Sequence, residues 1–498
     1  MRKIGHFING QHSSSLSGRF ADVFNPATGE VQAHVALANK ADLDAAIASA
    51  RTAQPGWAAT NPQRRARVMM RFVDLVNANM QALAEMMSRE HGKTIADSVG
   101  DIQRGLDVAE FAIGGPHLVK GEFSSDVGPG IDMYSLRQPV GIGAGITPFN
   151  FPAMIPMWMF APAIACGNAF ILKPSERDPS VPLRLAELMI EAGLPAGVLN
   201  VVNGDKEVVD AILTAPDISA VSFVGSTPIA AYVYAQGAAN GKRVQCFGGA
   251  KNHAVIMPDA DMEKAADALI GAGYGSAGER CMAISVAVPV GEGTAERLIA
   301  TLKPRVENLS VGPYTADKVD FGPVVTRAAR DKIYALVDMG VAEGAKLVVD
   351  GRKFRMQGYE NGFYVGPCLF DRVTRDMSIY KAEIFGPVLS VVRVRSADEA
   401  FEVNNGVKYG LSSSLYTKDV NLAFRAMNEL DNGITYVNAP TIGAEAHLPF
   451  GGVKQTGNGH REGGWEVYEF YSETKVGYVD FSGALQRAQI DNYAGAPT

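Results

Sequence analysis

Cys281 lies in a stretch whose residue types suit a nucleophilic thiol. It follows a run of small residues, Gly275-Ser276-Ala277-Gly278, and Arg280 directly precedes it. Small residues allow a backbone to approach a substrate closely. A neighbouring cation favours the thiolate, which is the nucleophilic form, below the free-thiol pKa of about 8.5. A buried cysteine in a tight loop has the same local pattern, so the stretch alone leaves both interpretations open.

Other polar residues stand where they could bind a carbonyl or a phosphate. Asn150 lies between two aromatic–proline pairs, and its amide could donate a hydrogen bond to a developing oxyanion. Ser226 follows a strand that ends at Gly225, and the helix beginning there would offer free N–H groups to a pyrophosphate. Lys173 and Glu176 follow an apolar strand and could reach ribose hydroxyls. Each has a plain alternative, namely a turn asparagine, a helix N-cap and a solvated loop.

Length and composition describe a multidomain globular protein. A chain of 498 residues is too long for one core, and its length suggests about three domains. The net charge of −7 argues against a nucleic-acid partner or an anionic membrane surface. Four scattered cysteines are too few for a disulfide framework or a CxxC metal site. We therefore expect no metal and a reducing, cytoplasmic compartment, and the first ten residues lack the apolar core of a signal peptide.

One uncharged stretch, residues 138–172, is long enough to suggest a membrane span. Five prolines and two asparagines interrupt it. The pattern therefore favours a buried core segment over a span.

The order of expected elements indicates an α/β architecture. The pattern predicts a hairpin over 20–38, helices from 40 to 115 (with 64–89 as one run) and extended segments over 131–147. Strands and helices then alternate from 148 to 257, and a second alternating series follows to about 450. This rhythm implies parallel sheets with helices on both faces, which is typical of nucleotide-binding domains.

Taken together, these signals resemble the aldehyde dehydrogenase superfamily. The motifs occur in the family's order and spacing and cover nearly the whole chain: Thr147–Pro152, Lys173–Glu176, Phe223–Ser226, Gly278–Cys281, Glu383–Pro387 and Pro449–Gly452. The resemblance implies an aldehyde dehydrogenase-like fold with a Rossmann-like NAD domain, a catalytic α/β domain and a small oligomerisation β-flap. We place the NAD domain at 1–123 and 143–251, the catalytic domain at 252–450, and the flap with the C-terminal strand and tail at 124–142 and 467–498.

The resemblance also implies roles for individual residues. Cys281 would be the nucleophile and Asn150 the oxyanion donor. The cofactor NAD would be held by Lys173 and Glu176 at the adenosine ribose, Gly225 and Ser226 at the pyrophosphate, Glu383 and Phe385 at the nicotinamide ribose and ring, and Phe149. Glu176 beside the ribose should disfavour a 2′-phosphate.

Phe247 marks a departure from the hydrolytic members of the family. Those members carry Glu-Leu-Gly-Gly-Lys before the catalytic cysteine, and that glutamate activates water. The matching stretch here is Phe247-Gly248-Gly249-Ala250-Lys251, and phenylalanine cannot accept a proton. A thiol acceptor with a pKa near 8.5 is ionised enough to attack without a base, so the departure favours coenzyme A as acceptor.

With this departure, the chain is most similar to the CoA-acylating methylmalonate-semialdehyde dehydrogenases. That resemblance implies oxidative decarboxylation of methylmalonate or malonate semialdehyde to propionyl-CoA or acetyl-CoA, with NAD reduced. It implies that Arg104 and Arg280 hold the substrate carboxylate, a task that suits the planar guanidinium. It also implies a homotetramer. A hydrolytic enzyme in which Glu462 relays a proton, or an inactive family member, remains an alternative, and the catabolic pathway (valine, β-alanine or inositol) stays open.

Overall fold

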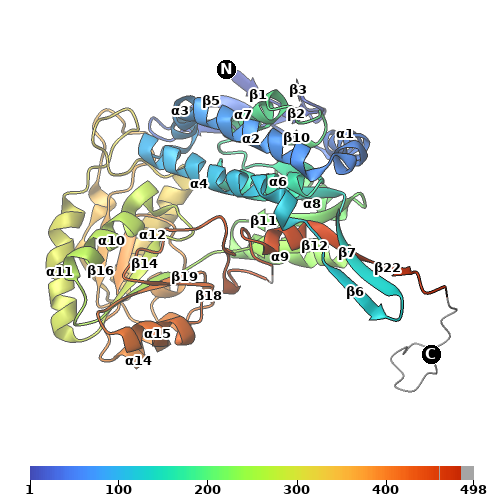
Figure 1. Ribbon diagram of the computed structural model, residues 1–498. Coiled ribbons are helices and arrows are strands. Elements are labelled where there is room, and N and C mark those ends of the chain that lie inside the picture. Colours follow the sequence, from blue (N-terminus) through green and yellow to red (C-terminus); the bar gives the residue numbers. More distant parts are fainter. Residues whose placement is uncertain (459, 484–498) are drawn as a thin grey trace.

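The computed structural model describes residues 1–458 and 460–483, and two seven-stranded sheets dominate it (Figure 1). The first sheet has the order β12-β11-β8-β9-β10-β2-β3. Its strands are β2 (His6–Ile8), β3 (Gln11–Ser13), β8 (Ile142–Ile146), β9 (Ala169–Lys173), β10 (Leu199–Val201), β11 (Ile218–Val224) and β12 (Arg243–Phe247). From β10 to β12 every pair is parallel, and the chain order reverses between β8 and β11. Such a switch point is where open α/β sheets bind ligands, at the carboxyl ends of the strands.

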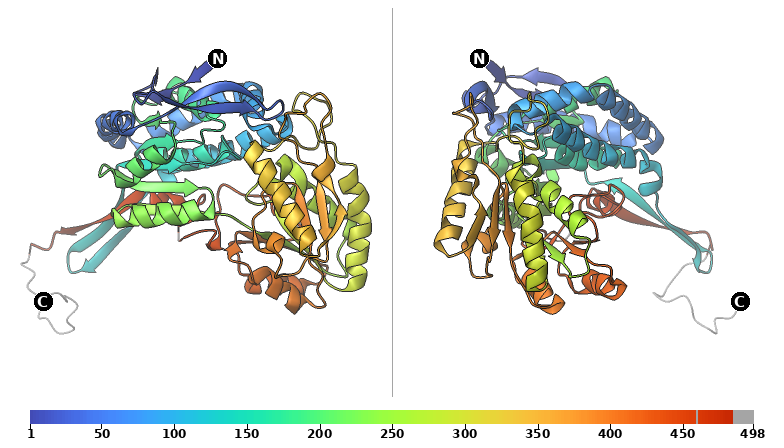
Figure 2. Two further views of the ribbon diagram at one scale, coloured as in Figure 1. Left: turned by 180° about the vertical axis from the view of Figure 1, so that it is seen from behind. Right: turned by 90° about the vertical axis from the view of Figure 1, so that its left-hand side faces the viewer.

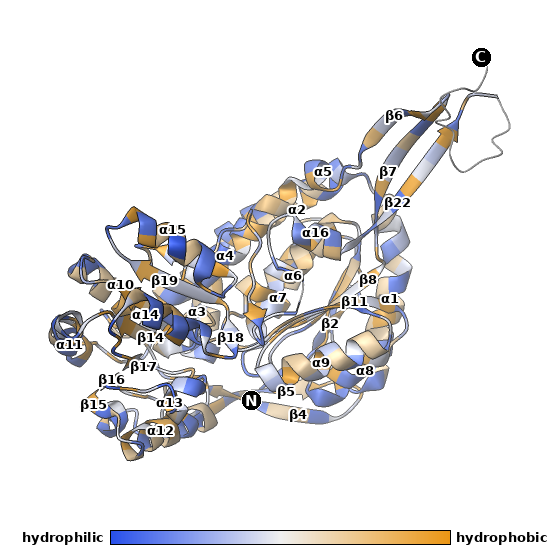
Figure 3. Cartoon of the chain, turned by 90° about the horizontal axis from the view of Figure 1, so that it is seen from below, coloured by the Kyte–Doolittle hydropathy of each residue, from blue (hydrophilic) through white to orange (hydrophobic). Residues whose placement is uncertain are grey.

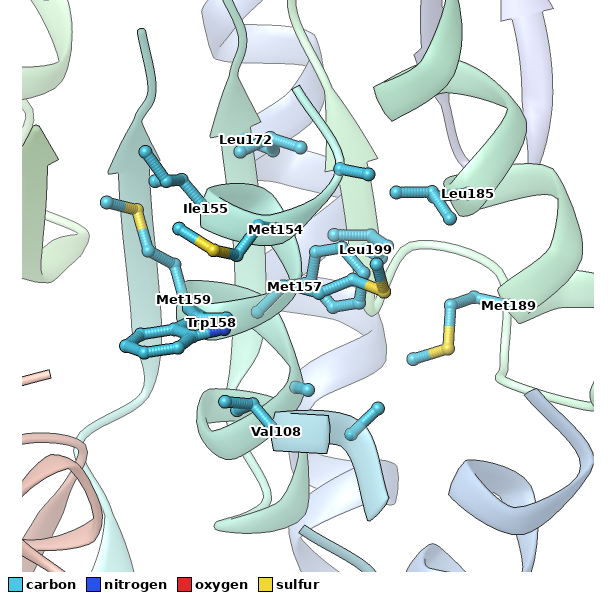
Figure 4. Packing of buried hydrophobic residues seen from close by; sticks show 14 of the residues in the cluster. Val108, Met154, Ile155, Met157, Trp158, Met159, Leu172, Leu185, Met189 and Leu199 are labelled. Carbon is cyan, nitrogen blue, oxygen red and sulfur yellow. The ribbon is translucent and has the colours of Figure 1, made fainter. Parts of the chain in front are cut away.

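Helices cover both faces of this sheet because its buried strands carry apolar residues on both sides. Ile171 packs in the core beneath α1 (Lys40–Ala59), α8 (Lys206–Thr214) and α9 (Thr227–Ala239). Leu172 points to the other face, into the core shared by α2 (Pro62–Ala78), α3 (Met80–His91), α4 (Ile95–Ile113), α6 (Met154–Ala165) and α7 (Ser180–Glu191). Figure 4 shows Met154, Met157 and Trp158 of α6 in this second core.

Helix α6 explains the uncharged stretch noted above. Every residue of α6 is buried, and the helix packs between the sheet and α4. The stretch is thus a core segment, as predicted. In the described part of the chain, no helix is long and apolar enough to cross a membrane.

The second sheet has the order β15-β16-β17-β14-β13-β19-β20 and is parallel except at β15. Its strands are β13 (Asn252–Ile256), β14 (Ile284–Pro289), β15 (Lys346–Val349), β16 (Cys368–Asp371), β17 (Val388–Val391), β19 (Ser412–Tyr416) and β20 (Ile434–Val437). The helices of this half are α10 (Met262–Tyr274), α11 (Glu292–Glu307), α12 (Arg327–Ala342), α13 (Ser378–Lys381), α14 (Ala397–Asn405) and α15 (Val420–Glu429). The two alternating series of the sequence form two α/β units, as predicted, but the boundary expected at 257 is wrong, because β13, the last strand of the first series, pairs with β14 and β19 of the second sheet.

A three-stranded antiparallel sheet projects from the body of the molecule (Figures 1 and 2). It consists of β6 (Phe123–Gly128), β7 (Ile131–Pro139) and β22 (Ser472–Asp480), and β22 pairs with β7 from Ser472↔Pro139 to Asp480↔Ile131. Figure 3 shows hydrophobic and hydrophilic residues mixed along these strands. Residues 484–498 of the expected tail lie outside the described residues.

Smaller elements complete the fold. They are β1 (Arg2–Ile4), the hairpin of β4 (Arg19–Asn25) and β5 (Glu30–Leu37), α5 (Gly115–Leu118), η1 (Gly275–Gly278), η2 (Gly351–Lys353), β18 (Tyr409–Gly410), β21 (Val453–Lys454) and α16 (Glu466–Phe470). The hairpin was predicted. The single helix expected over 64–89 is wrong, because the chain breaks at Asn79, which ends α2 and begins α3.

Candidate active site

The loop before Cys281 has a left-handed backbone. Ser276, Ala277 and Gly278 have φ of 52°, 54° and 72°. A side chain at Gly278 would meet the main-chain oxygen of Gly386 at 2.2 Å, so glycine is required there. Non-glycine residues rarely adopt this conformation, and when they do the surrounding structure must hold them. The loop thereby presents Cys281 to a narrow cavity that Glu383 and Phe385 also line.

The environment of Cys281 disfavours ionisation of its thiol. Burial raises the pKa of Cys281 to about 12, and the charges of Glu383 and Glu462 contribute to that increase. Arg280 does not offset them, because its guanidinium forms an ion pair with Asp97 of α4 and donates a hydrogen bond to Gly271 O at 3.2 Å. The sequence-based expectation that Arg280 lowers the thiol pKa is therefore wrong in this structure.

Asn150 is buried in the loop that leaves the carboxyl end of β8. Lys93 Nζ donates a hydrogen bond to the main-chain oxygen of Asn150 at 2.7 Å and pairs with Asp101 Oδ2 at 3.0 Å. Asp101 Oδ1 in turn accepts from Met154 N–H at 2.7 Å, and Lys93 lies over the ring of Phe151 at 4.7 Å. The loop is thus held at three points by one buried ion pair. Sequence reasoning missed this pair, because a lysine and an aspartate near a helix start are ordinarily solvated.

A cavity of about 1000 Å³ lies between α9 and α12. Ser226 and Thr227 line it at the N-terminus of α9, where no side chain caps the helix. Pro228 has no N–H, and the N–H groups of Ile229 and Ala230 donate to Ser226 O at 3.0 and 2.9 Å, which leaves the N–H groups of Ser226 and Thr227 for a ligand. Leu336 and Met339 of α12 supply an apolar wall. Three lysines, Lys332, Lys408 and Lys454, also line this cavity.

Glu383 connects this cavity to the thiol. It lines both the large cavity and the narrow one at Cys281, and its Oε1 accepts a hydrogen bond from Ala250 N–H at 2.9 Å. Burial raises the pKa of Glu383. Phe385 lies beside it with a positive φ of 57°, and its ring meets that of Phe149 edge-on at 6.0 Å.

The remaining predicted cofactor residues lie at the neighbouring strand ends. Lys173 ends β9 and pairs with Glu176 at 3.5 Å. Gly225 follows β11, and its N–H donates to Phe247 O at 3.0 Å. The large cavity is not lined by Lys173, Glu176 or Gly225.

Phe247 ends β12 and is buried, with 4% of its surface exposed. A Cβ at Gly451 would lie 3.0 Å from the Phe247 ring. Glu462 is also buried, and burial raises its pKa to about 8. Its carboxyl group is therefore mostly protonated at neutral pH.

The two arginines expected to hold a carboxylate both have acidic partners on α4, the helix to which Arg104 itself belongs. Arg104 Nη1 contacts Asp107 at 3.1 Å and donates to Ala444 O at 3.2 Å. Arg280 pairs with Asp97. Asp97 precedes Arg104 on α4 by about 10 Å along the helix axis, at a rise of about 1.5 Å per residue. Among the described residues, no contact joins the two guanidinium groups directly.

Comparison with known proteins identifies the family of the chain. The aldehyde dehydrogenase family model matches residues 12–476. The chain belongs to the aldehyde dehydrogenase family. This aldehyde dehydrogenase is 53% identical to malonate-semialdehyde dehydrogenase of Pseudomonas aeruginosa over 478 residues, 96% of each chain. It is 45% identical to malonate-semialdehyde dehydrogenase of Halalkalibacterium halodurans, over 95% of this chain and 97% of that one.

Solved structures confirm the aldehyde dehydrogenase fold. A putative methylmalonate-semialdehyde dehydrogenase from Sinorhizobium meliloti, complexed with NAD, superimposes with a TM-score of 0.96 at 65% identity, over 97% of this chain and 98% of that one. Methylmalonate-semialdehyde dehydrogenase from Oceanimonas doudoroffii gives a TM-score of 0.96 at 47% identity, over 97% and 99%.

Proposed function

We propose that this aldehyde dehydrogenase oxidises malonate or methylmalonate semialdehyde with NAD and transfers the resulting acyl group to coenzyme A, with loss of carbon dioxide. The names of its relatives support the substrate class. The observation that carries the choice of acceptor is Phe247, a buried apolar side chain at the position of the water-activating glutamate. Without that base, a thiol is a better acceptor than water.

The large cavity fits NAD. The open N-terminus of α9 at Ser226 suits a pyrophosphate, the α12 wall suits a flat ring, and Glu383 stands at the end nearest the thiol. We assign Lys173, Glu176 and Gly225 to the same cofactor from their strand-end positions. When bound, NAD accepts a hydride from the carbon being oxidised.

In the first half of the reaction the Cys281 sulfur attacks the aldehyde carbon, and the carbonyl oxygen takes up the negative charge. The Asn150 side chain stabilises that oxyanion as a hydrogen-bond donor. Loss of the hydride leaves a thioester on Cys281. The thiol must first lose its proton to water, and a pKa of about 12 makes this a demanding step.

In the second half a carboxylate β to the thioester leaves as carbon dioxide. Its bonding electrons pass into the thioester carbonyl as an enolate, which is then protonated. The thiolate of coenzyme A attacks the thioester carbon, and Cys281 departs as thiolate. Water is a poor competitor, because Phe247 accepts no proton.

Arg104 and Arg280 are the proposed anchors of the substrate carboxylate. Each has an acidic neighbour, Asp107 and Asp97 respectively. Binding of a carboxylate substrate therefore competes with these existing ion pairs.

The assembly proposed is a homotetramer in a reducing, cytoplasmic setting, built through the projecting sheet of β6, β7 and β22. Exposed apolar side chains on that sheet, among them Phe123 (67%) and Tyr478 (69%), support an interface there. We also propose the division into 1–123 and 143–251 for NAD, 252–450 for catalysis, and 124–142 and 467–498 for assembly.

The test is NADH formation from malonate semialdehyde and from propanal, with and without coenzyme A. We expect steady turnover only with coenzyme A, and acetyl-CoA as the product from malonate semialdehyde. Free acid formed at an unchanged rate without coenzyme A would overturn the proposal. A hydrolytic enzyme is the second candidate, because Glu462 is close enough to raise the pKa of Cys281 and its own pKa of about 8 suits proton transfer.

A further inference from the structure

A second cavity, of about 750 Å³, lies beside the cofactor cavity. Arg375, Tyr380, Lys381 and Lys408 are among the residues that line it. We refer to it as the Lys381 cavity. None of its basic residues except Lys408 lines the cofactor cavity, so it is a separate space.

Three cavities follow one another through shared residues. Lys408 lines both the Lys381 cavity and the cofactor cavity. Glu383 lines both the cofactor cavity and the narrow cavity at Cys281. A long ligand with one end in the Lys381 cavity would therefore reach the thiol through the cofactor cavity, and only after NADH has left that cavity.

The Lys381 cavity is cationic in a protein of net charge −7. Arg375, Lys381 and Lys408 line it, against a single carboxylate, Asp376. Arg375 has only a loose ion pair, at 3.8 Å from Glu402. A cleft of one sign concentrates ligands of the opposite charge.

Two of these cations form no ion pair among the described residues. Within the described residues, neither Lys381 nor Lys408 forms an ion pair, whereas Lys40, Lys206 and Lys303 each pair with an acidic residue four positions along a helix. Lys381 Nζ instead donates to the main-chain oxygen of Asp376 at 2.8 Å, which holds the ammonium at the cavity. That contact leaves two of its three donors for a ligand.

We propose that the Lys381 cavity binds the 3′-phosphorylated adenosine end of coenzyme A, whose thiol arm then runs past Lys408 and Glu383 to Cys281. This rests on the proposed use of coenzyme A as acceptor. A phosphate monoester carries close to two negative charges at neutral pH, and lysine and arginine form strong charge-assisted hydrogen bonds with it. NAD lacks a phosphate monoester, so it gains nothing from this cavity.

The test compares coenzyme A with 3′-dephospho-coenzyme A in the native enzyme and in Lys381→Gln. We expect Lys381→Gln to raise the KM for coenzyme A by on the order of tenfold and to leave the KM for the dephospho form unchanged. The matched control is Lys346→Gln, an exposed lysine of β15 outside the cavities, which should change neither KM. An unchanged KM for coenzyme A in Lys381→Gln, or an equal rise for both acceptors, would overturn the cavity assignment.

A binding measurement separates this proposal from the proposed function. Calorimetric titration with adenosine 3′,5′-bisphosphate, adenosine 5′-monophosphate and inorganic phosphate needs no turnover. We expect the bisphosphate to bind most tightly and Lys381→Gln to weaken it, even if turnover does not depend on coenzyme A. Equal binding to the native enzyme and Lys381→Gln would overturn the cavity assignment, whereas turnover independent of coenzyme A would overturn the proposed acceptor. If inorganic phosphate bound more tightly than either nucleotide, the cavity would be a simple anion site, and the cavity assignment would again be overturned.

Discussion

The side chain of Lys93 donates a hydrogen bond to the main-chain oxygen of Asn150 at 2.7 Å. Lys93 is fully buried and its charge is balanced by Asp101, which also holds Met154 N–H. A buried ion pair thus fixes the backbone of the residue that we assign to the oxyanion. We infer that the Lys93–Asp101 pair positions Asn150.

Lys93→Met should destabilise the protein by about 3–5 kcal/mol, because it leaves Asp101 buried without a partner. It should also slow NADH formation by up to about 100-fold, since a small shift of Asn150 misplaces the oxyanion donor. Urea unfolding and the first-turnover rate measure the two effects.

The double variant Lys93→Met/Asp101→Leu separates stability from positioning. Removing both charges should restore most of the lost free energy of unfolding, because no unpaired charge remains. The first-turnover rate should stay low. Full recovery of the rate would show that the pair does not position Asn150.

Phe247→Glu should create hydrolytic activity. A carboxylate at this position can take a proton from water, and a general base contributes roughly 100-fold or more to such a step. We expect free-acid formation without coenzyme A to rise by about that factor, measured by chromatography of the products. Phe247→Gln is the control, because glutamine has nearly the same size as glutamate but cannot act as a base. Equal acid formation by both variants would contradict the expectation.

The reactivity of Cys281 should rise steadily with pH. Because its pKa is raised to about 12, the thiolate fraction at neutral pH is small and should grow about tenfold per pH unit between about pH 7 and 10. The rate of alkylation by iodoacetamide reports this fraction. A plateau near pH 8 would refute the raised pKa.

Neutralising the nearby carboxylates should lower the pKa of Cys281, because both of their charges disfavour the thiolate. Glu383→Gln should therefore speed alkylation. Glu462→Gln should have an effect only above about pH 8, since Glu462 itself ionises with a pKa of about 8. Glu307→Gln, an exposed glutamate on α11, should leave the rate unchanged at every pH.

Asp97→Asn should improve binding of the carboxylate substrate. In the native protein Asp97 neutralises Arg280, and its removal frees the guanidinium. We expect the KM for malonate semialdehyde to fall by a factor of about ten and the KM for propanal to stay the same. Arg280→Ala should raise the KM for malonate semialdehyde and leave the KM for propanal unchanged. Parallel changes for both aldehydes would show that Arg280 does not bind the carboxylate.

Several elements could be predicted from local pattern, and the reasons are physical. The hairpin of β4 and β5 follows from alternation around a turn, and the parallel strands follow from short apolar runs between helices. The break at Asn79 was missed, because good helix formers stand on both sides of it. No strand was predicted at β12, although Arg243 to Cys246 alternate polar and apolar; the structure pairs this short run with β11 and packs Val244 and Cys246 in the core.

The sequence by itself determined the family resemblance, the proposal of Cys281 as nucleophile and the presence of phenylalanine at 247, since these depend on residue type and order along the chain. Only the tertiary structure decided which charges meet. Arg280 contacts Asp97, which is 183 positions away in the sequence, and Lys93 contacts Asn150, which is 57 positions away. Periodicity reports which face of an element is buried but not which element packs against it. The pairing of Arg280, the high pKa of Cys281 and the support of Asn150 therefore became visible only in the folded chain.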